Sequence, residues 1–255
     1  SEEGSPLSIK KVFKRYFDLS TKNLPTRTDL IIWPETAFPN SISSKSINNF
    51  EYPLPKLLNS VTEYTNTDLF FGGYNHNEKS FNQHFQSEYN TAFLLSSKTK
   101  QLTLYNKIKL LPFGEGLPFG PLNKFLSNYI NNISYFAAGD KFSLFTTSSK
   151  LRFTSAICYE ILFTNFIRKQ INNLNKMPQI IINLTNDSWY GDSSEPFQHL
   201  FLTKWRALEL QIPIVRSTNT GITSVLYPDG SESQRLNLNE IKNLDVSVIA
   251  PPIEK

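Results

Sequence analysis

The sequence is poor in the residues that form metal centres and cross-links. Cys158 is the one cysteine among 255 residues, so a disulfide within the chain and a cysteine-rich metal site are both excluded. The histidines, His76, His84 and His199, are widely spaced, which argues against a structural zinc site. We therefore expect the protein to work without a metal ion or another cofactor.

Long apolar runs are also absent. A helix needs about 18 consecutive apolar residues to cross a bilayer, whereas the longest apolar clusters here, such as 30–33 and 180–182, have the length of strands. The first residues, Ser-Glu-Glu-Gly-Ser, are acidic, and the apolar core of a secretory signal does not follow them. We expect a soluble chain; if it is part of a membrane protein, the membrane segments lie outside this sequence.

The charge is small and scattered. The net charge is +4, and the one basic group, Lys10, Lys11, Lys14 and Arg15, fits a solvated helix face. We therefore expect no nucleic-acid partner, while an anionic membrane surface is left open. The content of 39% hydrophobic and 19% charged residues is typical of a globular protein, and we expect a single domain at 1–255.

Apolar runs of strand length alternate with longer segments of helical period, which predicts an α/β layer fold. The predicted strands are 29–35, 68–74, 91–96, 102–107, 153–159, 179–186, 214–219 and 223–227, and the predicted helices are 9–22, 54–66, 161–175 and 197–210. In the last helix Phe201, Trp205 and Leu208 recur at spacings of three and four, so one face is apolar. Several strands are apolar on both sides, as expected where helices cover a sheet.

One long segment, 112–136, combines aromatic residues with glycine and proline. Its aromatic residues are Phe113, Phe119, Phe125, Tyr129, Tyr135 and Phe136. Two interpretations stay open. The aromatic side chains pack into the core, or they form an exposed apolar lip for a greasy substrate or a bilayer.

Three of the strand-like runs end in a side chain that can do chemistry. Glu35 follows an apolar run that Pro34 stops, and Lys107 ends another run. Cys158 ends a third and leads into a predicted helix that starts near Glu160, where the first amides of the helix favour a thiolate. Alone, each signal is weak, because a glutamate or lysine at a strand end is usually solvated and a lone cysteine is usually a small buried hydrophobe.

Together these residues suggest a Glu–Lys–Cys triad. Glu35 would take the thiol proton as general base, because a free cysteine is mostly protonated near neutral pH. The ammonium of Lys107, with backbone amides near Cys158, would stabilise the tetrahedral oxyanion. Glu35 would then return a proton to the leaving group and activate the second nucleophile.

Several longer runs surround these residues. They are Trp33-Pro34-Glu35-Thr36-Ala37, Tyr105-Asn106-Lys107, Pro112-Phe113-Gly114-Glu115, Ile157-Cys158-Tyr159-Glu160, Asn186-Asp187-Ser188-Trp189-Tyr190-Gly191-Asp192-Ser193 and Arg216-Ser217-Thr218-Asn219-Thr220-Gly221. In these runs the chain resembles the carbon–nitrogen hydrolase (nitrilase) superfamily and, within it, the extracytoplasmic domain of the apolipoprotein N-acyltransferases. The resemblance covers roughly residues 29–228.

The resemblance implies a four-layer α-β-β-α sandwich and a ping-pong reaction. Cys158 would take an acyl chain from a phospholipid as a thioester and pass it to the α-amine of a diacylglyceryl-cysteine at a lipoprotein N-terminus. Glu115, Tyr159 and Glu160 would support the site, although Glu160 also fits a simple acid in the first turn of a helix. The enzyme would lie in the bacterial inner membrane with this domain facing the periplasm.

The sequence departs from the family pattern in places. An apolar strand usually precedes the first helix, but none precedes Ile9; the membrane helices of the family are absent; and Gly116 and Glu195 replace a usual aromatic and a usual glycine. We assign His199, 186–193 and 218–221 to the wall of the pocket. Two other functions stay open: a soluble nitrilase-type amidase, and a catalytically dead domain that binds lipid or a partner.

Overall fold

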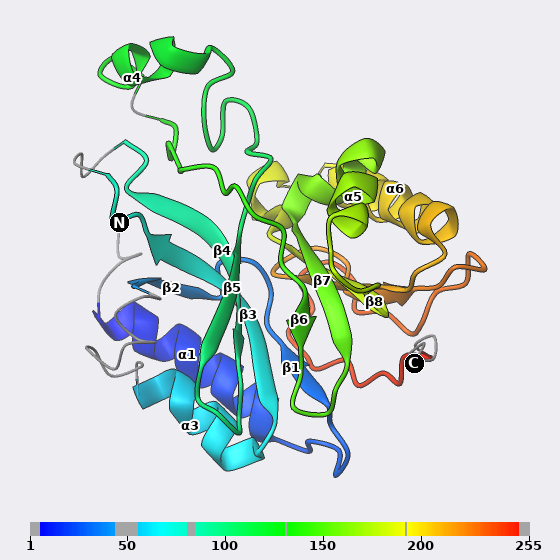
Figure 1. The fold of residues 1–255 in the computed structure, drawn as a ribbon. Coiled ribbons are helices and arrows are strands. Elements are labelled where there is room, and N and C mark those ends of the chain that lie inside the picture. The colour runs from blue at the N-terminus through cyan, green and yellow to red at the C-terminus, as the bar shows by residue number, and fades with distance from the viewer. Residues whose placement is uncertain (1–5, 44–55, 81–84, 131, 192, 250–255) are drawn as a thin grey trace.

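The computed structural model describes residues 6–43, 56–80, 85–130, 132–191 and 193–249. Two five-stranded sheets face each other, and a pair of helices covers the outer face of each. Figure 1 shows this order of layers, which confirms the predicted α-β-β-α sandwich. In the part of the chain described, no helix is both long enough and apolar enough to span a bilayer.

The first sheet has the strand order β1-β3-β4-β5, with β2 also paired to β3. Its strands are β1 (Leu30–Ile32), β2 (Phe38–Ile42), β3 (Asp68–His76), β4 (Glu88–Leu95) and β5 (Leu102–Asn106). Strands β1 and β2 run parallel to β3, and β3, β4 and β5 are antiparallel neighbours. Helices α1 (Pro6–Thr21) and α3 (Lys56–Thr65) cover this sheet.

The second sheet has the order β10-β9-β8-β7-β6. Its strands are β6 (Phe145–Thr146), β7 (Arg152–Ile157), β8 (Ile180–Thr185), β9 (Ile214–Thr218) and β10 (Ser224–Leu226). Strands β7, β8 and β9 are parallel, so their carboxyl ends meet at one edge. Helices α5 (Thr164–Asn172) and α6 (Glu195–Leu210) cover it, and 3₁₀ helices lie at Gly120–Leu122, Cys158–Leu162 and Asp187–Tyr190.

Three apolar layers hold the sandwich together, and strand alternation decides which residue enters which layer. Leu69 and Phe71 pack toward the helices α1 and α3, whereas Phe70 between them packs into the layer between the two sheets. In the second sheet Ile180 and Ile182 enter the central layer, and Ile181 packs toward α5 and α6. Successive side chains of a strand point to opposite faces, so strands buried on both sides are rich in apolar residues on both faces.

The structure differs from the predicted elements in short or irregular pieces. Strand β2 was not predicted, because its three middle residues, Pro39, Asn40 and Ser41, are a proline and two polar residues and are exposed. Strand β6 has two residues, which leave no readable pattern. The predicted helix 161–175 is shorter, because a 3₁₀ helix occupies Cys158–Leu162 before α5 begins.

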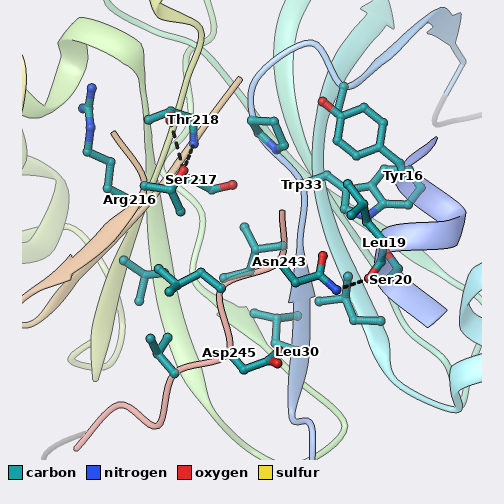
Figure 2. Close-up of a pocket in the computed structure, with 18 of the residues that line it drawn as sticks. Tyr16, Leu19, Ser20, Leu30, Trp33, Arg216, Ser217, Thr218, Asn243 and Asp245 are labelled. Atoms are coloured by element: carbon teal, nitrogen blue, oxygen red, sulfur yellow. Dashed lines mark hydrogen bonds between the residues drawn. The ribbon is translucent and has the colours of Figure 1, made fainter. Parts of the chain in front are cut away.

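A cavity of about 1250 Å³ lies between the two sheets beside the free edge of β1. Figure 2 shows Leu30 of β1 and Trp33, which directly follows β1, on one side of the cavity. Ser217 and Thr218 of β9 lie on the other side, and Asn243 of the C-terminal segment lies between them. Asn243 donates a hydrogen bond to the carbonyl of Leu19. Glu35, Lys107 and Cys158 do not line this cavity, so it lies beside the reactive residues and is not their pocket.

Candidate active site

Glu35 is held on a tight turn after β1. Its backbone lies against β3 at Gly72, where an added Cβ would come within 2.6 Å of the Glu35 Cα, so glycine is required at that position. The side chain is buried, and the backbone amide of Asn186 donates to the carboxylate. Burial raises the pKa of Glu35 to about 7, with the nearby ammonium of Lys107 opposing that rise. A carboxyl with this pKa can exchange a proton near neutral pH.

Lys107 directly follows β5, and its ammonium lies close to the carboxylate of Glu35. Its Nζ lies 2.7 Å from Glu115 Oε2 and 3.9 Å from Glu35 Oε1. Burial by itself lowers the pKa of Lys107, but Glu35, Cys158 and Glu115 outweigh this and raise it above its ordinary value. The lysine is therefore a fixed cation with 1% of its side chain exposed. The predicted neighbours Glu35, Lys107 and Glu115 do come together.

Asn90 joins the two glutamates, and sequence reasoning missed it. Its Nδ2 donates to Glu35 Oε1 at 2.7 Å and to Glu115 Oε1 at 2.9 Å. The second oxygen of Glu115 also accepts from the amide of Leu111 at 2.9 Å. The predicted strand began one residue later, at Thr91, and Asn90 lies among other polar residues of β4, Glu88 and Thr91, so no sequence signal singled it out.

Cys158 begins the 3₁₀ helix that follows β7, with a left-handed φ of 53°. This conformation is strained for a residue with a side chain and is typical of functional positions. Burial raises the pKa of the thiol to about 12, the charge of Glu35 adds to the rise, and Lys107 opposes it. Burial therefore outweighs the preference for a thiolate at the start of this short helix, and the thiol needs a base, which is the role expected of Glu35.

Glu160 connects the cysteine turn to the lysine turn. Its carboxylate accepts hydrogen bonds from the amides of Ile157, Ile108 and Lys109 and from the hydroxyl of Tyr105, all at 2.8–2.9 Å. Burial raises its pKa, and the backbone hydrogen bonds oppose that rise. Glu160 is thus far more than a first-turn helix acid, because it fixes the first sheet's site residues to the second sheet's.

The side chain of Tyr159 contacts helix α6, whereas that of Glu160 contacts the turn that carries Lys107. Its hydroxyl donates to Glu195 Oε1 at 2.6 Å, and its ring stacks on His199 with centroids 5.0 Å apart. Glu195 is the residue that replaces the usual glycine, and here it receives this hydrogen bond. Burial lowers the pKa of His199 to about 4, so the imidazole is neutral and serves as packing against Tyr159.

One group among the described residues has the ligand types of a metal site. Asp187, Glu195 and His199 each offer an atom, and these atoms lie within 4.8 Å of one another. Arg216 Nη2 already contacts Asp187 Oδ2 at 2.8 Å, and Tyr159 donates to Glu195. Because Arg216 already pairs with Asp187 and the Tyr159 hydroxyl already bonds Glu195, we interpret the group as a hydrogen-bonded network near Cys158.

The aromatic segment extends away from the sheets, with the short helix α4 (Asn123–Leu126) at its tip (Figure 1). Phe113, Phe119, Phe125 and Tyr129 are between 48% and 71% exposed, and only Tyr135 is buried. Packing into the core is therefore wrong for the first four. The side chains form an exposed lip that includes Leu122, and helix α6 likewise exposes Phe201 and Trp205.

Residues 6–248 match the carbon–nitrogen hydrolase family. The chain belongs to this family. Apolipoprotein N-acyltransferase of Bdellovibrio bacteriovorus is 33% identical over 235 residues, which are 90% of this chain and 42% of that protein. The protein of the same name from Rickettsia prowazekii is 37% identical over 216 residues, 84% of this chain and 40% of that protein. The chain thus spans less than half of these relatives' length.

Solved structures agree on the fold. An amidase of the nitrilase superfamily from Nesterenkonia superposes with a TM-score of 0.63 at 17% identity, covering 91% of this chain and 82% of the amidase. A hydrolase-superfamily protein from Xanthomonas campestris, with an arsenic adduct in its active site, gives 0.64 at 16% identity and the same coverage. At this identity the likeness establishes the carbon–nitrogen hydrolase fold and confirms the expected sandwich.

Proposed function

We propose that this domain is the acyl-transferring part of an apolipoprotein N-acyltransferase, with Glu35, Lys107 and Cys158 as its catalytic residues. The observation that carries the proposal is the buried cluster of Glu35, Lys107 and Glu115 around a neutral thiol. The names of the two curated relatives described above support the choice of acyl transfer. Glu115, Tyr159 and Glu160 support the catalytic residues through their contacts.

In the first half-reaction Glu35 takes the proton of the Cys158 thiol, and the sulfur attacks an ester carbonyl of a phospholipid. The oxyanion forms beside the Lys107 ammonium, which is already in place and pays no cost of reorganisation. The tetrahedral intermediate then breaks the ester C–O bond. Glu35 returns the proton to the leaving alkoxide, and the acyl chain stays on Cys158 as a thioester.

In the second half-reaction the α-amine of a diacylglyceryl-cysteine attacks the thioester carbonyl. Glu35 removes a proton from the attacking nitrogen, and Lys107 again faces the oxyanion. The C–S bond breaks, an amide bond forms, and the Cys158 sulfur regains a proton from Glu35. The phospholipid donor and the diacylated lipoprotein acceptor are thus the proposed partners.

We infer that the domain faces the periplasm at the bacterial inner membrane, held by helices elsewhere in a longer protein. The exposed lip of Phe119, Leu122 and Phe125 supports this, because large apolar side chains at the tip of an extension suit the edge of a bilayer. An amidase would more often close over a small polar pocket.

Intact-mass spectrometry of the full protein in detergent, incubated with phospholipid, tests the proposal. We expect a mass gain of one acyl chain that hydroxylamine removes and that Cys158→Ala lacks. Release of ammonia from small amides without a lipid adduct would favour the amidase. A Cys158 that reacts with neither substrate and resists iodoacetamide would indicate a domain that only binds lipid or a partner.

A further inference from the structure

Thr185 lies behind the nucleophile at the end of β8. In the parallel pairing of β7 with β8, Ile157 is opposite Leu184, so Cys158 and Thr185 each lie next to the last residue pair of the two strands. Thr185 is fully buried, and its side chain acts to lower the pKa of the Cys158 thiol, against the larger effect of burial. The Thr185 Oγ1 also lies 3.2 Å from Asp187 Oδ1. The hydroxyl therefore stands between the sulfur and a carboxylate.

A hydroxyl has one proton to donate, so it cannot donate to both neighbours at once. While Cys158 is a thiol, its S–H can donate to Thr185 Oγ1, and the hydroxyl donates to Asp187. Once the sulfur has lost its proton, it can only accept, and the hydroxyl must turn toward it to make a hydrogen bond. Hydrogen bonds to an ionised group are the stronger kind, which favours this second arrangement.

Asp187 tolerates the loss of the Thr185 hydrogen bond because it keeps other partners. Arg216 Nη2 lies 2.8 Å from its Oδ2, and His199 Nδ1 lies 3.4 Å from its Oδ1. An added Cβ at Gly221 would come within 1.9 Å of Asp187 Oδ2, so glycine is required there for the carboxylate to hold this position. The carboxylate is thus fixed while the hydroxyl is free to turn.

The backbone of Cys158 is fixed as well. Asn183 Nδ2 donates to the Cys158 carbonyl at 3.2 Å, and Arg216 Nη1 holds the Asn183 Oδ1 at 2.9 Å. Because both the nucleophile's backbone and Asp187 are held, the moving part is reduced to the rotation of one hydroxyl. Such preorganisation lowers the cost of stabilising a charge that develops during the reaction.

We propose that Thr185 is a further catalytic residue: its hydroxyl accepts from the Cys158 thiol at rest and donates to the sulfur once Glu35 has taken the proton. The inference rests on the proposed role of Cys158 as the nucleophile. It assigns the thiolate two stabilising groups, the ammonium of Lys107 and the hydroxyl of Thr185.

Alkylation of Cys158 by iodoacetamide, measured from pH 6 to pH 10 in the full protein, tests the inference without any lipid substrate. Thr185→Val keeps the shape and removes the hydroxyl, and Thr185→Ser keeps the hydroxyl. We expect Thr185→Val to slow alkylation about tenfold near neutral pH and to move the pH profile upward, because a hydrogen bond to a charged group is lost. Thr185→Ser should stay close to wild type. The charged groups that face Cys158, namely Glu35, Lys107, Glu115 and Arg216, are unchanged in both variants.

A wild-type profile in folded Thr185→Val, or equal losses in Thr185→Val and Thr185→Ser, would overturn the inference, since a merely structural role moves stability and not the pH profile. If Thr185→Val does not fold, Thr185→Ala gives the same comparison with Thr185→Ser. Glu35→Gln, measured in parallel, separates the two levels. If Cys158 is alkylated rapidly in Glu35→Gln, the proposed role of Glu35 as the base is wrong. If alkylation is slow in Glu35→Gln but normal in Thr185→Val, only the role inferred for Thr185 is wrong.

Discussion

The base and the tip of the segment 107–129 are built in opposite ways. At its base, Lys107 and Glu115 are buried and form an ion pair, with Lys107 Nζ 2.7 Å from Glu115 Oε2. At its tip, Phe119 and Phe125 are exposed and contact neighbouring rings of the same segment. The base depends on charge balance inside the protein, and the tip offers apolar surface outside it. One continuous stretch of chain thus separates chemistry from contact with a greasy partner, so mutations can affect either one alone.

The largest effect is expected at the base, for Glu35→Gln. Loss of the general base should slow acyl transfer and Cys158 alkylation by roughly 10²–10⁴-fold. Because the pKa of Glu35 is raised to about 7, wild-type alkylation should rise with pH through about 7 as the carboxyl ionises. In Glu35→Gln that rise should vanish, and reactivity should increase only at alkaline pH, where the thiol itself ionises. Glu63→Gln, on the exposed face of α3, is the control that should match wild type.

Lys107→Met breaks the charge balance of the base. It leaves the carboxylates of Glu35 and Glu115 buried without their cation, which we expect to cost about 3–5 kcal/mol of unfolding free energy. The loss should be smaller at pH 5 than at pH 8, since the raised pKa of Glu35 lets it be neutral below about 7. Urea unfolding at both pH values measures this. An equal loss for Lys109→Met, whose side chain is exposed, would contradict the explanation.

Glu160→Gln tests the connection between the two sheets. A glutamine has one acceptor oxygen, so at least one of the four donors around Glu160 loses its partner, and we expect a loss of about 1–3 kcal/mol. Tyr105→Phe removes a single donor and should cost about 1 kcal/mol. Chemical denaturation orders the two variants. A Tyr105→Phe loss larger than that of Glu160→Gln would mean that the tyrosine acts through packing instead.

The smallest effect on stability belongs to the tip. Phe119→Ser with Phe125→Ser should change the unfolding free energy by less than about 0.5 kcal/mol, because both side chains are exposed. Binding of the domain to anionic phospholipid vesicles, followed by sedimentation, should nevertheless weaken. Met177→Ser removes an equally exposed apolar side chain elsewhere and is the matched control. If the double variant binds vesicles as well as wild type does, the tip does not contact lipid.

Among the described elements, sequence patterns predicted every strand except β2 and β6 and the four longest helices, and short motifs pointed to Glu35, Lys107, Glu115, Cys158, Tyr159 and Glu160. Asn90 was missed because its function comes from two glutamates, 55 and 25 residues away, that only the fold brings to it. The raised pKa of the Cys158 thiol could not be predicted from the sequence, because a helix N-terminus is visible in a sequence while burial is not. The exposure of the aromatic tip stayed open, since the sequence alone does not show whether a phenylalanine is buried or exposed.

The sequence by itself determined the order of most strands and helices, through apolar periodicity, and it indicated the proposed catalytic residues, through their positions at strand ends. Only the tertiary structure decided their protonation, their partners and the exposure of the aromatic tip. The physical reason is that periodicity acts between residues close in sequence, whereas burial and charge pairing act between residues close in space. Glu35, Lys107 and Cys158 lie on three separate turns, and the packing of two sheets brings them into one electrostatic cluster.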